Sequence, residues 1–163
     1  MRTRVPLFAL LLLFGSAAHP TTGGEVAVIV NAANATQEIS FRDLEKIFRQ
    51  DKQFWSDGKK IYLVMLETGS QEKDVVLQRL YRMNEAELKK FWLQKMFKGE
   101  IATFPKTLSS AGSITQFVAK VPNAIGFVDA SVADSSVRTD SSVRVLKIDG
   151  KLPGAAGYPL GTK

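Results

Sequence analysis

The fold is decided by the stretch Ile61-Tyr-Leu-Val-Met-Leu-Glu-Thr-Gly-Ser70. Its first six residues form a short apolar run bounded by turn-forming residues, which is typical of a buried strand. The run ends at Thr68-Gly69-Ser70, and serine is one of the residues preferred at the N-cap of a helix. We therefore expect a buried strand over 61–66 that leads directly into a helix ending near Met83.

Other parts of the chain repeat these strand and helix patterns. Short β-branched runs predict further strands over Glu25–Val30, Ala124–Val128 and Val143–Ile148. Capping residues and apolar residues at helical spacing predict helices that begin at Ser40 and Asn84, and a third that carries Ile114 to Val121.

The segments between these elements are expected to be irregular. They are a loop around Pro105, the Ser/Asp-rich stretch Ala130–Ser142, and a Gly- and Pro-rich tail after Asp149-Gly150 that should be loose. Because strands and helices alternate, the sequence predicts an α/β domain with a mixed sheet of about four to five strands flanked by helices.

The N-terminus has the pattern of an export signal. Arg2 and Arg4 precede an apolar run from Val5 to Phe14, and small residues follow up to Ala18. The run is too short for a membrane span, which needs about twenty apolar residues. We expect residues 1–18 to be a signal peptide, and residues 19–163 to form one periplasmic or secreted domain with its core over about 25–150 and no membrane insertion after cleavage.

The composition excludes most catalytic chemistry. The chain has no cysteine, and its one histidine is His19, at the expected new N-terminus. This removes Cys nucleophiles, His-containing triads and His/Cys metal sites from the folded body. Carboxylate-only catalysis remains a minor alternative. We expect no enzyme, no metal and no cofactor.

The charge pattern argues against a nucleic-acid partner. Loss of Arg2 and Arg4 lowers the formal net charge of +6 by two units, and the remaining lysines alternate with Asp and Glu. Nucleic-acid binders usually gather basic residues on one face, which this sequence does not do.

The turn Thr68-Gly69-Ser70 is the most specific candidate site. A strand-to-helix turn presents free backbone N–H groups and the positive end of a helix dipole, which together favour an anion. The competing interpretation is that Ser70 only caps the helix. Glu72 favours this second interpretation, because a carboxylate in the first turn already satisfies the dipole and repels an anion.

Two aromatic pairs have competing interpretations as well. Phe54-Trp55, beside the turn Ser56-Asp57-Gly58, is either a ligand clamp or a cover for the end of the core, and the second is favoured. Phe91-Trp92 falls on the apolar stripe of its helix and is expected in the core.

Taken together and in order, several segments resemble the periplasmic phosphate-binding proteins of phosphate ABC transporters, within the wider type 2 periplasmic-binding-protein-like family. The segments that carry the resemblance are Val26–Asn31 with Asn34, Ile39–Phe48, Trp55–Gly58, Gly69-Ser70, Phe91-Trp92 with Phe97–Gly99, Ala124–Val128, Val145–Gly150 and Tyr158–Leu160. The resemblance covers Val26 to Leu160 and implies a single lobe of the two-lobed fold, a phosphate or other small oxyanion as ligand, and an ABC permease or another periplasmic protein as partner.

The resemblance also assigns site residues. The phosphate loop of the family tends to read Gly-Ser-Gly-Thr followed by Arg, and the corresponding stretch here is Gly69-Ser70-Gln71-Glu72-Lys73. Gly69 and Ser70 match, whereas Lys73 keeps the positive charge without the bidentate fork of arginine. The expected ligand-binding residues are therefore Gly69, Ser70 and Lys73, with Thr68 and Asn31 as further candidates by position alone.

Two functions remain open at this stage. The first is a solute-binding module that holds an oxyanion near Gly69, Ser70 and Lys73. The second is an interaction or accessory module that has kept the fold and lost the ligand, and it predicts an exposed apolar patch where the second lobe would sit.

Overall fold

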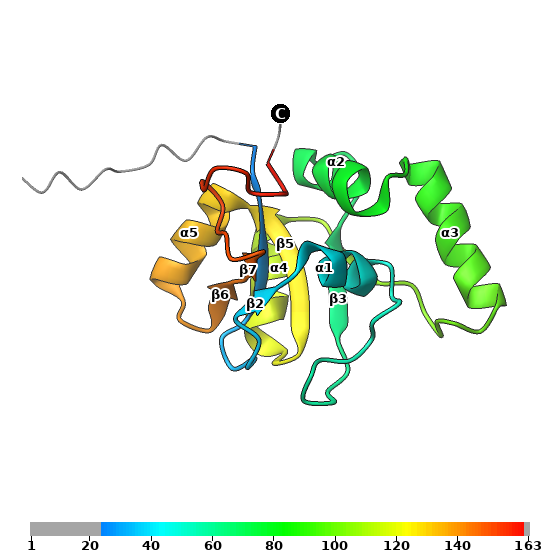
Figure 1. The fold of residues 1–163 in the computed structure, drawn as a ribbon, viewed down its shortest axis with the longest axis horizontal. Coiled ribbons are helices and arrows are strands. Elements are labelled where there is room, and N and C mark those ends of the chain that lie inside the picture. Colours follow the sequence, from blue (N-terminus) through cyan, green and yellow to red (C-terminus); the bar gives the residue numbers. More distant parts are fainter. Residues whose placement is uncertain (1–23, 162–163) are drawn as a thin grey trace, which may run out of the picture.

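The computed structural model describes residues 24–161, so the expected signal peptide and His19 lie outside the described residues. The fold is an α/β arrangement with a mixed five-stranded sheet in the order β4-β3-β5-β1-β6 and a separate two-stranded sheet of β2 and β7 (Figure 1). The strands are β1 (Val26–Asn31), β2 (Glu38–Ile39), β3 (Tyr62–Leu66), β4 (Lys106–Leu108), β5 (Ala124–Asp129), β6 (Val143–Val145) and β7 (Lys147–Ile148).

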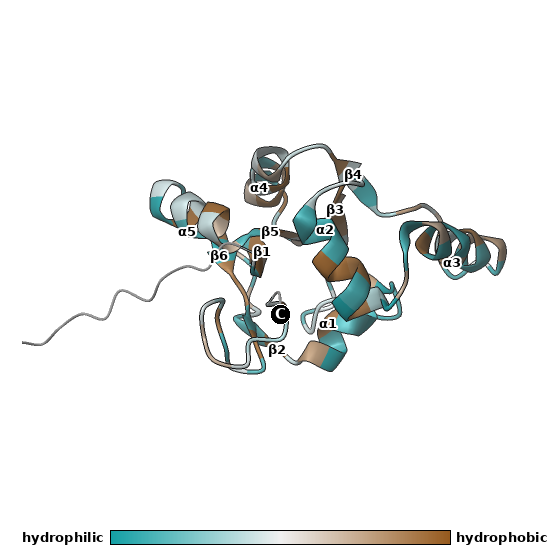
Figure 2. Cartoon of the chain, turned by 90° about the horizontal axis from the view of Figure 1, so that it is seen from above, coloured by the Kyte–Doolittle hydropathy of each residue, from teal (hydrophilic) through white to brown (hydrophobic). Residues whose placement is uncertain are grey.

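Helices cover both faces of the larger sheet. The helices are α1 (Phe41–Phe48), α2 (Gln71–Val76), the π-helical turn η1 (Leu77–Tyr81), α3 (Glu85–Phe97), α4 (Ala111–Lys120) and α5 (Ala130–Thr139). In Figure 2 the helices α4 and α5 lie on one side of the strands, α1 and α2 lie on the other, and α3 stands beyond the β3–β4 end. The predicted α/β class with a mixed sheet flanked by helices is confirmed.

Strand directions decide which ends of the strands meet. β5 is parallel to β3, with Leu63 paired to Ile125, and β3 is parallel to β4. β1 runs antiparallel to β5, with Val26 paired to Asp129. The end of β3 therefore lies at the same edge of the sheet as the end of β5 and the start of β1.

The core is built around β1 and β5. Residues 26–30 of β1 are at most 1% exposed, and residues 124–128 of β5 are buried as well. The apolar stripe of α1 ends in Phe48, whose ring lies 6.0 Å from that of Phe127. On the opposite face, α4 buries Ile114 and Val118. The continuous apolar runs in the sequence thus became strands that are covered on both faces.

The helix starts follow the capping residues. Ser40 accepts a hydrogen bond from the N–H of Asp43 at 3.1 Å. Asn84 and Glu87 form a reciprocal capping box with bonds of 3.0 and 2.8 Å. The predicted starts of α1 and α3 are therefore confirmed, because these side chains satisfy backbone donors that have no partner within the helix.

The expected loop over Ala130–Ser142 is wrong, because this stretch contains helix α5. Asp129 caps it by accepting from the N–H of Ser131 at 2.8 Å. Only Ala130 and Ala133 are buried, so the helix packs through a narrow stripe of small residues. The Ser and Asp residues that suggested a loop lie mostly on its exposed face, where the cost in helix propensity is small.

Three smaller differences concern strands and the first part of a helix. The region after Pro105 contains the edge strand β4, whose polar sequence gave no strand signal. The strand expected over Val143–Ile148 is divided between the two sheets as β6 and β7. The helix expected from Ser70 to Met83 consists of α2 followed by η1 and ends at Tyr81.

The C-terminal tail, expected to be loose, packs against the start of β1. Tyr158 and Leu160 are buried. Val26 donates its N–H to the carbonyl of Leu160 at 3.0 Å, and the Tyr158 hydroxyl donates to the carbonyl of Val26 at 2.9 Å. The tail therefore covers the end of the sheet at which β1 begins.

Among residues 24–161, no helix has both the length and the apolar character that crossing a bilayer requires.

We predict that Gly126→Ala destabilises the fold by about 1–3 kcal/mol, because the new methyl group overpacks the core. A Cβ at this position would lie 2.8 Å from Ile114 and 2.9 Å from Val64. The matched control is Gly112→Ala on α4, whose Cβ would meet only the Ser110 hydroxyl oxygen, at an ordinary contact distance of 4.0 Å, and should stabilise the helix by up to about 1 kcal/mol. Urea unfolding of both variants measures the difference, and equal stabilities would contradict the packing described between β5 and α4.

Candidate functional site

The end of β3 forms the exposed turn that the sequence singled out. Gly69 has a φ of +97°, a conformation that side chains with a Cβ rarely adopt. Ser70 caps α2 by accepting from the N–H of Lys73 at 3.1 Å. Among residues 24–161, no acceptor faces the backbone N–H groups of Ser70, Gln71 and Glu72. The turn therefore combines a capped helix start with three backbone donors.

The side chain of Lys73 points away from this turn. It is only 5% exposed, and its Nζ donates to the carbonyl of Leu66 at 3.1 Å. Burial lowers the pKa of Lys73 from its ordinary value, although the charge of Glu85 partly offsets this effect. The ammonium group that the resemblance assigned to an anion thus lies inside the protein.

Asn31 lies at the opposite end of the sheet. Because β1 is antiparallel to β5, its last residue lies near the start of β3. The Asn31 amide donates to the carbonyls of Val118 at 2.9 Å and Ala119 at 2.8 Å, and its oxygen accepts from Ala33. This side chain satisfies carbonyls in the last turn of α4. The structure thus brings together Thr68, Gly69, Ser70 and Lys73 but not Asn31.

Carboxylates surround the end of β3. Glu67 precedes the turn, Glu72 lies in the first turn of α2, and Glu85 begins α3 within 3.7 Å of Lys73. With the lysine turned inward, the electrostatic environment of the turn is unfavourable for an anion. Backbone donors are the groups that remain for one.

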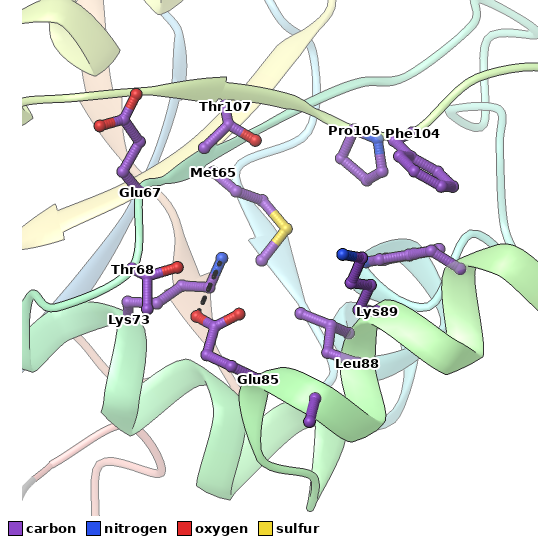
Figure 3. A pocket seen from close by; sticks show the side chains of 12 residues that line it. Met65, Glu67, Thr68, Lys73, Glu85, Leu88, Lys89, Phe104, Pro105 and Thr107 are labelled. Carbon is purple, nitrogen blue, oxygen red and sulfur yellow. Dashed lines mark ion pairs between the residues drawn. The ribbon is translucent and has the colours of Figure 1, made fainter.

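A cavity of about 700 Å³ opens beside this turn, between the β3–β4 pair and the first half of α3 (Figure 3). Its size is in the range typical of small-molecule sites. Its apolar lining consists of Met65, Ala86, Leu88, Trp92, Phe104 and Pro105, and its polar lining consists of Glu67, Thr68, Lys73, Glu85, Lys89 and Thr107.

Sequence reasoning missed most of this cavity. Of the residues expected to bind a ligand, only Thr68 and Lys73 line it. Of the remaining lining residues, Met65 and Glu67 belong to the end of β3, and the rest come from α3 and from the segment before and within β4, which lie far from the turn in sequence. The apolar stripe of α3 was a visible signal, but Trp92 was expected only in the core, and it is indeed buried.

Lys73 and Glu85 form a polar pair inside the cavity (Figure 3). The separation of 3.7 Å between Nζ and Oε1 is that of an ion pair but too long for a hydrogen bond. The Glu85 side chain is partly exposed, yet its Oε1 atom is buried and has no hydrogen-bond partner in the described part of the chain.

The exposed large apolar side chains do not gather at the turn. Those of the described residues are Phe54, Tyr62, Met96, Phe97, Phe104, Val137 and Leu152. None belongs to the turn or to the tail segment 154–161 that closes this edge. Phe104 is the member of this set that lines the cavity beside the turn, and the apolar patch expected where a second lobe would sit stays a prediction. Trp55 covers the end of the core as predicted, whereas Phe54 is exposed.

Between residues 24 and 161, no three or more His, Cys, Asp or Glu side chains gather in a way that could hold a metal ion.

Comparison with known proteins gives matches in structure only. No protein-family model and no curated protein matches the sequence. Solved structures of phosphate-binding proteins match the fold. An ABC-type phosphate transport receptor from Vibrio cholerae has a TM-score of 0.61 at 18% identity and covers 79% of this chain and 48% of its own.

Two further structures give the same result. PstS from Borrelia burgdorferi has a TM-score of 0.63 at 19% identity over 83% of this chain and 53% of that chain. A putative phosphate ABC transporter substrate-binding protein with bound phosphate, from Clostridium perfringens, has a TM-score of 0.60 at 20% identity over 79% of this chain and 46% of that one. The chain spans about half the length of these proteins, so it resembles one lobe.

The lowered pKa of Lys73 predicts a specific pH dependence of stability. Between that pKa and the ordinary value of 10.5 the unfolded chain binds more protons than the folded one, so this residue makes stability rise with pH. Lys73→Met should lose this contribution, and its free energy of unfolding should fall relative to the unsubstituted protein as pH approaches 10.5. Lys60→Met removes an exposed lysine and is the control. Parallel pH profiles for Lys73→Met and the unsubstituted protein would contradict the burial of this ammonium.

Proposed function

We propose that this chain is an exported solute-binding module that works as one lobe of a phosphate-type binding protein. Its ligand is a small oxyanion, phosphate in the first instance, held at the turn Thr68-Gly69-Ser70. The observation that carries the proposal is the position of this turn. In a fold similar to that of phosphate-binding proteins, a sheet strand ends there in three backbone N–H groups that have no acceptor among residues 24–161.

The backbone of the turn supplies the chemistry. An oxyanion near Gly69 can accept from the N–H groups of Ser70, Gln71 and Glu72, which have no other partner among the described residues. Gly69 carries no Cβ and nothing lies within 4 Å of where one would be, so a ligand can approach the backbone closely. Ser70 is engaged with the N–H of Lys73 and contributes mainly by fixing the turn.

The affinity of this lobe alone should be low. Lys73 is turned toward Leu66 and Glu85, and Glu72 adds a negative charge to the first turn of α2. A single lobe also leaves one side of the ligand open to water. We infer that a second protein, an ABC permease or another periplasmic chain, covers the ligand on that side.

The accessory alternative is less well supported by the geometry. It requires an exposed apolar patch where the second lobe would sit. The turn itself carries none of the exposed large apolar side chains of the described residues, and Phe104 lines the neighbouring cavity. The tail already covers this edge through Tyr158 and Leu160. A polar turn with free donors fits a small polar solute better than a permanent protein contact.

Export is part of this proposal and can be tested directly. Expression of the full chain in a bacterial host should give a processed protein. Its intact mass, measured by mass spectrometry, should correspond to a chain that begins at His19. Recovery of the unprocessed protein from the cytoplasmic fraction, with none in the periplasmic fraction, would contradict the expected signal peptide.

Phosphate binding is tested by calorimetric titration of the purified protein, with sulfate as a control ion. We expect weak, millimolar binding that strengthens about two- to fivefold in Glu72→Gln, because a charge in the first turn of a helix is worth about 0.3–1 kcal/mol. Glu38→Gln removes an equivalent charge from β2, away from the turn, and should leave the affinity unchanged.

Amide NMR signals of Gly69 and Ser70 follow the same titration. They should shift with phosphate in both the unsubstituted protein and Glu72→Gln. Flat calorimetry together with unshifted signals in both proteins would remove the oxyanion and favour the accessory alternative.

A further inference from the structure

We propose that the cavity between the β3–β4 pair and α3 binds an uncharged, hydroxyl-rich small molecule of the polyol or monosaccharide class. This site is distinct from the oxyanion contact proposed above, because it uses side chains of the cavity and not the backbone donors of the turn. The inference begins with the polar pair inside the cavity.

Lys73 and Glu85 leave hydrogen-bonding capacity unused. A protonated lysine has three N–H donors, and the Nζ of Lys73 has one close acceptor, the carbonyl of Leu66 at 3.1 Å. The buried Oε1 of Glu85 has no donor within hydrogen-bonding distance among residues 24–161. A hydroxyl group both accepts and donates, so a ligand hydroxyl can accept from Lys73 and donate to the Glu85 oxygen that faces the cavity (Figure 3).

The charges of the lining select against an ionic ligand. Glu67 and Glu85 balance Lys73 and Lys89, so the formal charge of the cavity wall is zero. An anion would lie against two carboxylates, and a cation would lie against the buried ammonium of Lys73. The wall therefore offers no excess of either charge to attract an ion.

The remaining lining suits a ligand with both hydroxyl groups and a C–H surface. Thr68 and Thr107 add hydroxyls that donate and accept. Met65 from β3 and Leu88 from α3 point into the space from opposite sides (Figure 3). Together with Trp92, these apolar groups offer a surface on which the C–H groups of a sugar or polyol can pack. A single water molecule could connect Lys73 to Glu85, but it would leave this apolar surface unfilled.

The chain carries its own reporter for the cavity. Of its two tryptophans, Trp92 lines the cavity, whereas Trp55 lies elsewhere and donates to the carbonyl of Asn123. In Trp55→Phe the fluorescence of Trp92 alone reports occupancy. Glycerol, myo-inositol and D-glucose are the probes, titrated to tens of millimolar beside sodium phosphate at equal ionic strength.

We expect at least one of the three polyols to give a saturable change in Trp92 fluorescence, whereas phosphate gives none. Glu85→Ala in the same background should weaken this binding about tenfold or more, as for loss of a hydrogen bond to a charged group. Glu72→Gln is the matched control, because this carboxylate does not line the cavity. It should strengthen phosphate binding by calorimetry and leave the polyol affinity unchanged.

The two proposals fail separately in this design. No saturable signal from any of the three probes, or a signal that Glu85→Ala leaves unchanged in a folded variant, overturns the cavity proposal and says nothing against the oxyanion turn. Circular dichroism confirms folding of each variant. If Trp55→Phe does not fold, calorimetry of the unsubstituted protein and of Glu85→Gln gives the same decision.

Discussion

The antiparallel pairing of β1 with β5 is the constraint on which the rest of the structure depends. Both strands are buried on both faces, and the register that joins Val28 to Phe127 fixes how α1 and α4 pack from opposite sides. β5 is also parallel to β3 and lies between β3 and β1, so the last residues of β3 and the first residues of β1 are at the same end of the sheet. The position of the turn at Gly69, and the closure of that edge by the tail at Leu160, both follow from it.

Whether a helix or strand could be predicted from the sequence depended on the apolar residues that it buries. The central strands are apolar throughout, and helices with clear capping residues such as Asn84 start where expected, because local hydrogen bonds decide those positions. Helix α5 was missed because it buries only two alanines, and β4 because an edge strand needs no apolar pattern. In both α5 and β4, contacts with the rest of the fold outweigh the preference of the local sequence for a loop.

The candidate site shows the same limit at the level of side chains. Sequence placed Gly69 and Ser70 correctly at a strand-to-helix turn, since glycine and serine act there through local backbone geometry. The sequence could not show that the long side chain of Lys73 folds back to the carbonyl of Leu66. The spacing of residues along a helix defines the face on which a side chain starts, but it does not define where a long, flexible side chain ends. The place of Asn31 depended on the relative direction of β1 and β3, a property of the whole sheet.

The inward lysine has a consequence for how one lobe can recognise ligands. A cation buried beside Glu85 cannot also neutralise an anion above Gly69, so the turn is left with backbone donors and the cavity keeps a balanced pair of charges. Backbone donors favour a small oxyanion weakly, whereas a fixed lysine–carboxylate pair favours a neutral group that both donates and accepts. The turn and the cavity therefore use different hydrogen-bonding groups. A ligand bound at one of them leaves the donors and acceptors of the other available.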